Sequence, residues 1–259
     1  MDHVLIVGGG KDSSLVVEKV HEIGLRALVV DIDPEAPGAL KADRTLRAST
    51  HEHLPLLEEL RCMAQQGVHV AAVVTRSSGT PVLTTARIAE ALDLPGASVG
   101  AATTLTTKLG LSKLCRESGI LETNAVQVDQ GSASELAGGR LPCVIKPNLG
   151  HVGKRGVTLV SRPSSVEDAV QRAHEASVDG TVIMERYVPG VDLSLISMVC
   201  AGRLYPCFVL EEMNRFDDRG EVVCRGFRLL DPGKDHHRAA LTTVAQKIVT
   251  AAGVDYSPF

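Results

Sequence analysis

Residues 144–157 read VIKPNLGHVGKRGV, an apolar run that gives way to glycines and cations before the chain turns apolar again. The runs PCVIKP (142–147) and GVTLV (156–160) flank this loop, an arrangement that favours a β-hairpin. Gly150, Gly153 and Gly156 allow successive backbone N–H groups to point inward and form an anion-binding nest. Taken alone, the loop leaves two hypotheses open: a flap that holds phosphate, or a surface hairpin whose basic residues are solvated.

Two common phosphate motifs do not account for the loop. A P-loop requires serine or threonine after its lysine, but Arg155 follows Lys154. Phosphate binding at a helix N-terminus does not apply either, because the loop lies between two predicted strands. A phosphate site therefore needs support from elsewhere in the sequence.

A second glycine run, GGGKDSS (8–14), follows the first predicted strand. It is not a P-loop, because an aspartate follows its lysine, and Ser13 stands at the third glycine position of the dinucleotide fingerprint. Gly8 and Asp31 still leave an NAD-dependent enzyme open as an alternative. The other interpretations are a tight strand-to-helix turn and a turn whose amides line a small-substrate site.

Size and composition restrict the class of protein. The chain has 259 residues, of which 44% are hydrophobic and 22% charged, and this length supports two domains with buried cores. A net charge of −4, no tryptophan and 3% aromatic residues argue against nucleic-acid binding. We find no secretory signal and no apolar run of about 18 residues, and the six cysteines stand singly. These features predict a cytoplasmic protein with free thiols and no membrane contact.

The first hundred residues alternate short apolar runs with helical patterns. The apolar runs are HVLIVGGG (3–10), LRALVVDIDP (25–34) and VAAVVT (70–75), with helices at 13–23 and 81–96. Because such alternation is typical of a parallel sheet with crossover helices, we predict a Rossmann-like α/β domain over residues 1–102.

The rest of the chain predicts a linker helix and an α+β domain. The linker occupies 103–122, with a helix from Thr103 to Gly119, and the second domain occupies 123–259. Beyond the hairpin we expect a helix at 164–177, opened by a capping box of Ser164 and Glu167. Strands follow at 181–188 and 192–210, the second with a turn at Ala201-Gly202, and a last helix spans about 238–252.

Four side chains outside the loop favour a nucleotide. Lys146 lies within an apolar strand, where its ammonium can hold a phosphate oxygen as a fixed charge. Lys108, on the linker helix, supplies a second such charge. Glu185 follows three apolar residues of a predicted strand, where it is either an exposed acid or an acceptor for the amine of adenine. Asp192, beyond the next turn, is placed to bind ribose hydroxyls.

The order of these pieces is itself informative. A lysine on the helix before the second domain precedes VIKP (144–147), a glycine loop ending in GKRGV (153–157) and VIMERYVPGVDLS (182–194). This order resembles the ATP-grasp superfamily. The segments LIVGGG (5–10), VVDIDPEAPGALKADRTLRAST (29–50), LPGAS (94–98) and TTKLGLSKLCRESGI (106–120) are similar to the domain and linker that precede the grasp domain in its carboxylate–amine ligases. The resemblance covers nearly the whole chain.

The resemblance assigns roles to individual residues. It makes Lys108 and Lys146 the two nucleotide lysines, Glu185 the hinge acid that receives the adenine amino group, and Asp192 the ribose acid. It places the backbones of Tyr187 and Val188 against the adenine ring. The loop that covers the phosphates would comprise Gly150, His151, Val152, Gly153 and Gly156, with Lys154 where small residues are usual.

The resemblance also implies the reaction and its cofactors. ATP with Mg²⁺ would phosphorylate a small-molecule carboxylate, and an amine would displace phosphate from the acyl phosphate. The Mg²⁺ ligands are expected on strands beyond Phe259, so we assign no metal ligand and no catalytic residue, and expect a grasp domain incomplete at its carboxyl end. The alternative is a catalytically inactive nucleotide- or partner-binding module. A homodimer through the first domain is also implied.

Overall fold

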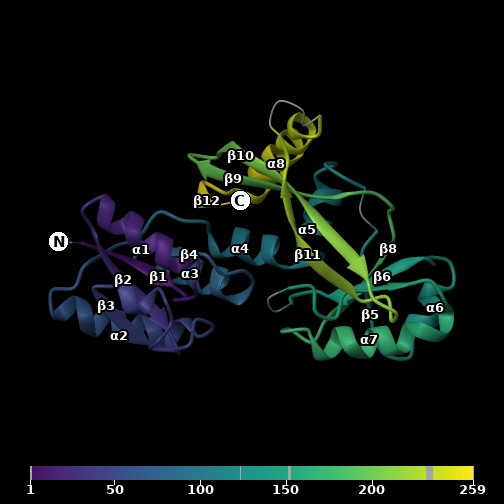
Figure 1. The fold of residues 1–259 in the computed structure, drawn as a ribbon, viewed down its shortest axis with the longest axis horizontal. Coiled ribbons are helices and arrows are strands. Elements are labelled where there is room, and N and C mark those ends of the chain that lie inside the picture. The colour runs from purple at the N-terminus through teal and green to yellow at the C-terminus, as the bar shows by residue number, and fades with distance from the viewer. Residues whose placement is uncertain (1, 123, 151–152, 232–235, 259) are drawn as a thin grey trace. The chain divides into compact units, whose positions relative to one another are not determined.

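The computed structural model describes residues 2–122, 124–150, 153–231 and 236–258. The chain forms two compact units, Met1–Ala102 and Thr103–Phe259, which we call the first and second unit (Figure 1). Each has its own hydrophobic core.

The first unit is built on a parallel sheet, as predicted. Its strands are β1 (His3–Val7), β2 (Arg26–Asp31), β3 (Arg44–Arg47) and β4 (Val70–Thr75), in the order β3-β2-β1-β4. Strand β1 pairs in parallel with both β2 and β4, and β2 pairs in parallel with β3. The edge strand β3 was not predicted, because its sequence RTLR lacks an apolar run.

Helices cover both faces of this sheet. Leu56, Leu57 and Leu60 of α2 (His53–Gln65) and Ile88 of α3 (Thr80–Ala91) pack against one face. Val17 and Val20 of α1 (Ser13–Glu22) pack against the other, and a 3₁₀ helix, η1, follows β2 at Ala39–Lys41. We expected α3 to end at Pro95-Gly96, but it ends at Ala91, since Asp93 has a φ of 54° that no helix continues.

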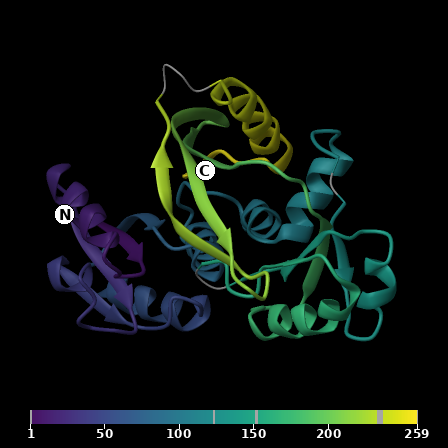
Figure 2. The same cartoon turned by 45° about the vertical axis from the view of Figure 1, so that its right-hand side comes forward.

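The second unit contains two antiparallel sheets (Figure 2). The first has the order β5-β8-β6-β7, formed by β5 (Val126–Val128), β8 (Val182–Arg186), β6 (Cys143–Pro147) and β7 (Thr158–Val160). Helices α6 (Ala133–Ala137) and α7 (Val166–Glu175) pack on one face of it, and η2 (Pro163–Ser165) precedes α7. The pairing of β6 with β7 confirms the predicted hairpin around the glycine loop.

The second sheet has the order β11-β10-β9-β12. Its strands are β11 (Val222–Leu229), β10 (Arg203–Phe216), β9 (Asp192–Cys200) and β12 (Tyr256–Pro258), with α8 (Arg238–Ala252) packed on β9 and β10. The predicted turn between β9 and β10 is confirmed, since Ala201 and Gly202 both have a positive φ, of 49° and 72°. Strands β11 and β12 were not predicted.

Two further local predictions were wrong. The single linker helix is two helices, α4 (Val99–Thr106) and α5 (Lys108–Glu117), because Thr107 is extended with a ψ of 133°. Gly110 permits this break, since a Cβ there would lie 2.7 Å from the carbonyl oxygen of Thr104. The capping box does not form either: α7 begins at Val166 without a side-chain cap, and Glu167 accepts a hydrogen bond from Ser134.

Candidate functional site

The two faces of the β6–β8 pair carry different chemistry. On one face Cys143, Ile145 and Met184 join the core beneath α7. Lys146 and Glu185 point to the opposite face, since Lys146 is paired with Ile183, two residues before Glu185. The Lys146 Nζ lies 2.6 Å from the Glu185 Oε2, with the side chains 20% and 30% exposed. Because side chains alternate along the strands, one face of the pair is buried in the core and the other carries charge.

Lys108 adds a second ammonium group to this face. It is the first residue of α5, and its Nζ donates a hydrogen bond of 3.1 Å to the carbonyl oxygen of Asn148. Burial lowers the pKa of Lys108, and the ammonium of Lys146 lowers it further, while Glu185 and Asp179 act in the opposite direction. Two cations and a carboxylate thus share one small region, and an additional anion would stabilise the charged form of Lys108.

Two of these charged residues, Lys108 and Glu185, line a pocket of about 300 Å³. Helix α5, the end of β8 and helix α8 contribute its walls. Its lining residues include Lys108, Leu111, Cys115, Glu185, Val188 and Ile248. A mostly apolar pocket with charged groups at its margin suits a ligand with a flat apolar part and a charged part.

The glycine loop joins β6 to β7 beside this region. Gly153 and Gly156 have positive φ values of 83° and 75°, while His151 and Val152 lie outside the described residues. The Lys154 Nζ lies 2.6 Å from the Glu212 Oε2 on β10, so the loop contacts the second sheet. The Val222 amide also donates to the Val157 carbonyl at 2.9 Å.

Glu212 is held in its ionised form by its neighbours. Burial raises the pKa of Glu212, but hydrogen bonds from Lys154, Ser194 and Asn214 outweigh burial, so its pKa lies below the ordinary value. Asn214 also donates to Asp192, which brings the expected ribose acid into the same group. Sequence reasoning missed Glu212 and Asn214. Their i, i+2 spacing in a strand, which places both side chains on one face, was the available signal.

At the end of β8, two backbone amides are hydrogen-bonded within the protein and the next residue is exposed. The Arg186 amide donates to the Asn124 Oδ1 at 3.0 Å, and the Tyr187 amide donates to the Pro142 carbonyl at 3.0 Å. Val188 is 77% exposed and lines the pocket. The amide of Tyr187 is therefore already hydrogen-bonded within the protein. Of the two residues predicted to contact adenine with their backbones, Val188 is the exposed one.

The glycine turn of the first unit is organised differently. The Asp31 Oδ2 accepts the Gly9 amide at 2.7 Å, and its Oδ1 accepts the Asp33 amide at 2.9 Å. The Gly38 amide donates to the Gly9 carbonyl at 2.7 Å, and a Cβ at Gly9 would lie 3.0 Å from Ala36. The carboxylate that an NAD site would need is engaged by its own loop, which favours the interpretation as a strand-to-helix turn.

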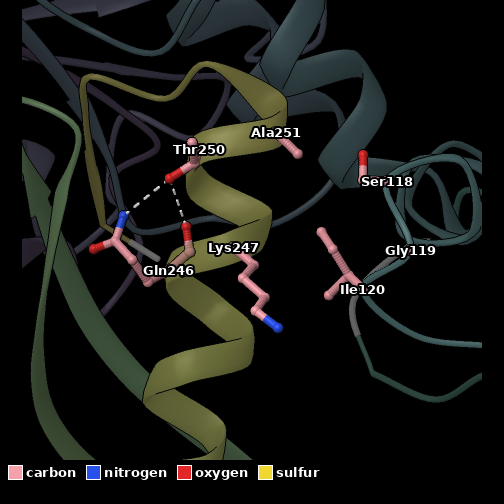
Figure 3. Close-up of a pocket in the computed structure, with 7 residues that line it drawn as sticks. All are labelled: Ser118, Gly119, Ile120, Gln246, Lys247, Thr250 and Ala251. Atoms are coloured by element: carbon pink, nitrogen blue, oxygen red, sulfur yellow. Dashed lines mark hydrogen bonds between the residues drawn. The ribbon is translucent and has the colours of Figure 1, made fainter.

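A larger cavity, of about 420 Å³, lies where the C-terminal half of α8 faces the end of α5 (Figure 3). Its lining includes one charged residue, Lys247, which points from α8 toward Ile120. Gln246 is occupied by hydrogen bonds to the backbone of Gly202 and Leu204. Since the described residues that line this cavity include no second charge, the chemistry favours the smaller pocket.

The described residues form neither a metal-binding cluster nor a membrane-spanning helix. Within them, no three or more His, Cys, Asp or Glu side chains are grouped so as to hold a metal ion. None of the helices within the described ranges has the length and apolar character needed to cross a membrane.

The fold, but not the sequence, matches known proteins. No protein-family model and no curated protein matches the chain. The crystal structure of L-amino acid ligase from Bacillus licheniformis matches with a TM-score of 0.77 and 17% identity, over 100% of this chain and 62% of that one. N5-carboxyaminoimidazole synthetase from Staphylococcus aureus, complexed with ADP, matches with a TM-score of 0.77 and 15% identity, over 96% and 63%.

A third match is biotin carboxylase from Campylobacter jejuni in a β-γ-ATP complex, with a TM-score of 0.73 and 19% identity over 98% of this chain and 60% of that one. The chain thus spans less than two thirds of the length of these enzymes. Within that span, it has their fold: a Rossmann-like α/β domain followed by an ATP-grasp α+β domain.

Proposed function

We propose that the second unit binds ATP on the charged face of the β6–β8 pair. One observation carries this proposal: the ammonium groups of Lys108 and Lys146 are brought close to Glu185, and Lys108 and Glu185 line the 300 Å³ pocket. Partly buried cations are costly, and a polyphosphate would compensate Lys108 and add to the compensation that Glu185 gives Lys146. The adenine would occupy the pocket, with Glu185 accepting from its amino group and Asp192 binding the ribose.

The residues present act on ATP by position and charge. Lys108 and Lys146 would hold phosphate oxygens, and the amides of Gly153 and Gly156 would cover them. No covalent intermediate with the protein is needed, because phosphoryl transfer depends mainly on alignment and neutralisation of charge. Mg²⁺ would accompany the ATP and neutralise its oxygens.

For the whole protein, we propose ATP-dependent ligation of a small-molecule carboxylate to an amine through an acyl phosphate. The fold shared with a ligase, a synthetase and a carboxylase supports this proposal. Binding of Mg²⁺, homodimerisation and a cytoplasmic location belong to the same proposal. Six free cysteines, two of them buried, support a reducing compartment.

Calorimetric titration with a non-hydrolysable ATP analogue and Mg²⁺ tests nucleotide binding. We expect a dissociation constant between about 1 μM and 1 mM that is lost in Lys146→Ala and Glu185→Ala. Lys113→Ala is the matched control, because Lys113 lies on α5 but forms an exposed ion pair with Glu117. Unchanged binding in both site variants would refute the site.

Phosphate release separates the ligase from an inactive nucleotide-binding module. The ligase requires release of inorganic phosphate from ATP that depends on both an acid and an amine. An ATP-binding protein that releases no phosphate with any pair in a panel of carboxylic acids and amines would support the module.

A further inference from the structure

Asn148 joins three separate segments of the second unit. It follows β6 and is 6% exposed. Its amide donates to the Thr181 carbonyl at 2.9 Å, and its side-chain Nδ2 donates to the Asp179 Oδ2 at 2.6 Å. On the other side, its two oxygens accept hydrogen bonds from the start of α5. The residue therefore connects the glycine loop, the turn before β8 and helix α5.

Asn148 provides the N-terminal cap that α5 otherwise lacks. The preceding residue, Thr107, makes no side-chain capping bond. Instead, the carbonyl oxygen of Asn148 accepts the Lys108 amide at 3.3 Å, and its Oδ1 accepts the Leu109 amide at 2.9 Å. Two of the unpaired N–H groups at the helix start are thus satisfied by a residue about 40 positions away.

The same residue fixes the ammonium of Lys108. The Lys108 Nζ donates to the Asn148 carbonyl oxygen at 3.1 Å. Asp179 determines which way the side-chain amide of Asn148 faces, because a carboxylate only accepts and must meet the Nδ2. Asp179 is itself held by Ser177 and by the amide of Thr181. Asp179 thus orients Asn148, and Asn148 in turn holds the start of α5 and the Lys108 ammonium.

We propose that Asn148 is a positioning residue for nucleotide binding, which acts by capping α5 from outside the helix and thereby setting where the Lys108 ammonium stands. This inference rests on the proposed ATP site and adds to it a residue without any assigned role there. Asn148 itself need not touch the nucleotide, since its polar groups are engaged within the protein.

The test compares Asn148→Ala with a compensating pair. Asn148→Ala removes the side-chain acceptor of the Leu109 amide and the hydrogen bond to Asp179. We therefore expect affinity for the ATP analogue to fall about tenfold. The double variant Asn148→Asp with Asp179→Asn reverses the polarity of the 148–179 hydrogen bond and keeps the acceptor for Leu109. We expect the double variant to recover most of the affinity.

The pH dependence of affinity distinguishes positioning from stability alone. The groups that face Lys108 are Lys146 of β6, Glu185 of β8 and Asp179 of the preceding turn. A loosened α5 exposes Lys108 to water, so the loss of affinity at alkaline pH should move to higher pH in Asn148→Ala. Gln246→Ala is the matched control, because its amide also makes two hydrogen bonds to the backbone, at Gly202 and Leu204, but lies outside the site. This control should bind as the wild type does.

Each outcome decides the inference. Failure of the wild-type chain to bind the analogue would overturn the proposed function and this inference together. Wild-type binding that Lys108→Ala abolishes but Asn148→Ala leaves unchanged, in strength and in pH dependence, would overturn the inference alone. If Asn148→Ala does not fold, the double variant decides, and affinity not restored in a folded double variant would count against the proposal.

Discussion

At the scale of single residues, the candidate site depends on cations that are partly withdrawn from water. Lys146 is compensated by Glu185 within the protein, at 2.6 Å. Lys108 donates to a neutral carbonyl, and burial and a second ammonium nearby lower its pKa while the carboxylates of Glu185 and Asp179 act in the opposite direction. A bound phosphate should therefore stabilise the charged form of Lys108.

The pH dependence of nucleotide affinity tests this expectation. Burial and then Lys146 lower the pKa of Lys108 below 10.5, so its charge is lost at a lower pH than that of an exposed lysine. Affinity for the ATP analogue should fall as the pH rises through this lowered pKa. Lys108→Arg should remove the alkaline fall, since a guanidinium stays charged. Titrations between pH 7 and 10 measure it, with Lys113→Arg as the control. An identical fall in Lys108→Arg would contradict the assignment.

Glu212 gives a prediction for stability in acid. Because its folded-state pKa is lowered, its stabilising contribution is present above pH 4.5 and is lost as the pH falls through the folded-state pKa. Glu212→Gln should cost about 1–3 kcal/mol at pH 7. The deficit should vanish in acid, as urea unfolding at several pH values would show.

The neighbouring Glu211→Gln is the control for that prediction. Glu211 pairs with Arg228, whose side chain is 64% exposed, so its loss should cost less than about 1 kcal/mol. Equal losses in the two variants, or a Glu212→Gln deficit that persists in acid, would contradict the role of the Lys154–Glu212 pair.

Sequence reasoning located some of these residues and not others, for a physical reason. Lys146 and Glu185 stand out because each interrupts an apolar strand, and strand alternation is a local property. Asn148 does not stand out, because its role depends on contacts with Leu109 and Asp179, 39 and 31 positions away. Contacts between residues so far apart in the chain produce no periodic pattern in the sequence.

At the scale of elements, the glycine loop is shaped by two glycines with different surroundings. Gly153 has open space where a Cβ would stand, whereas a Cβ at Gly156 would lie 2.8 Å from the Cβ of Ala176 and 3.1 Å from the carbonyl oxygen of Arg172. Both have a positive φ. Backbone freedom explains the first glycine, while the second is also required by close packing on α7.

The two glycines should therefore respond differently to alanine. Gly153→Ala should destabilise the second unit by about 1 kcal/mol, from backbone strain alone. Gly156→Ala should cost about 1–3 kcal/mol more, since α7 must shift as well. Urea unfolding measures both. Equal costs would mean that α7 does not restrict the loop.

Elements were predicted well where the pattern was strong. The parallel strands β1, β2 and β4 and the hairpin of β6 and β7 follow from apolar runs bounded by glycine and proline. The break between α4 and α5 was missed because Thr107 is compatible with a helix, and only the contact of Gly110 with the preceding turn reveals it. That break makes Lys108 the first residue of a helix.

At the scale of the whole molecule, the two units have separate cores, so a core mutation should act on one unit alone. Ile145 and Leu28 are fully buried in the second and first unit, respectively. Ile145→Ala and Leu28→Ala should each cost about 2–5 kcal/mol. Hydrogen exchange followed by mass spectrometry should show lost protection only in the mutated unit. Equal loss in both units would mean that they unfold as one.

The ion pair between Lys154 and Glu212 has a thermodynamic consequence for the proposed ATP site. A phosphate that draws Lys154 to itself removes a donor from Glu212, and the carboxylate becomes a weaker acid. Binding of phosphate at the loop and protonation of Glu212 are then thermodynamically linked, and each must change the other by the same free energy. The observed enthalpy of binding near pH 5 would accordingly vary with the ionisation enthalpy of the buffer, and the number of protons taken up could be read from that slope.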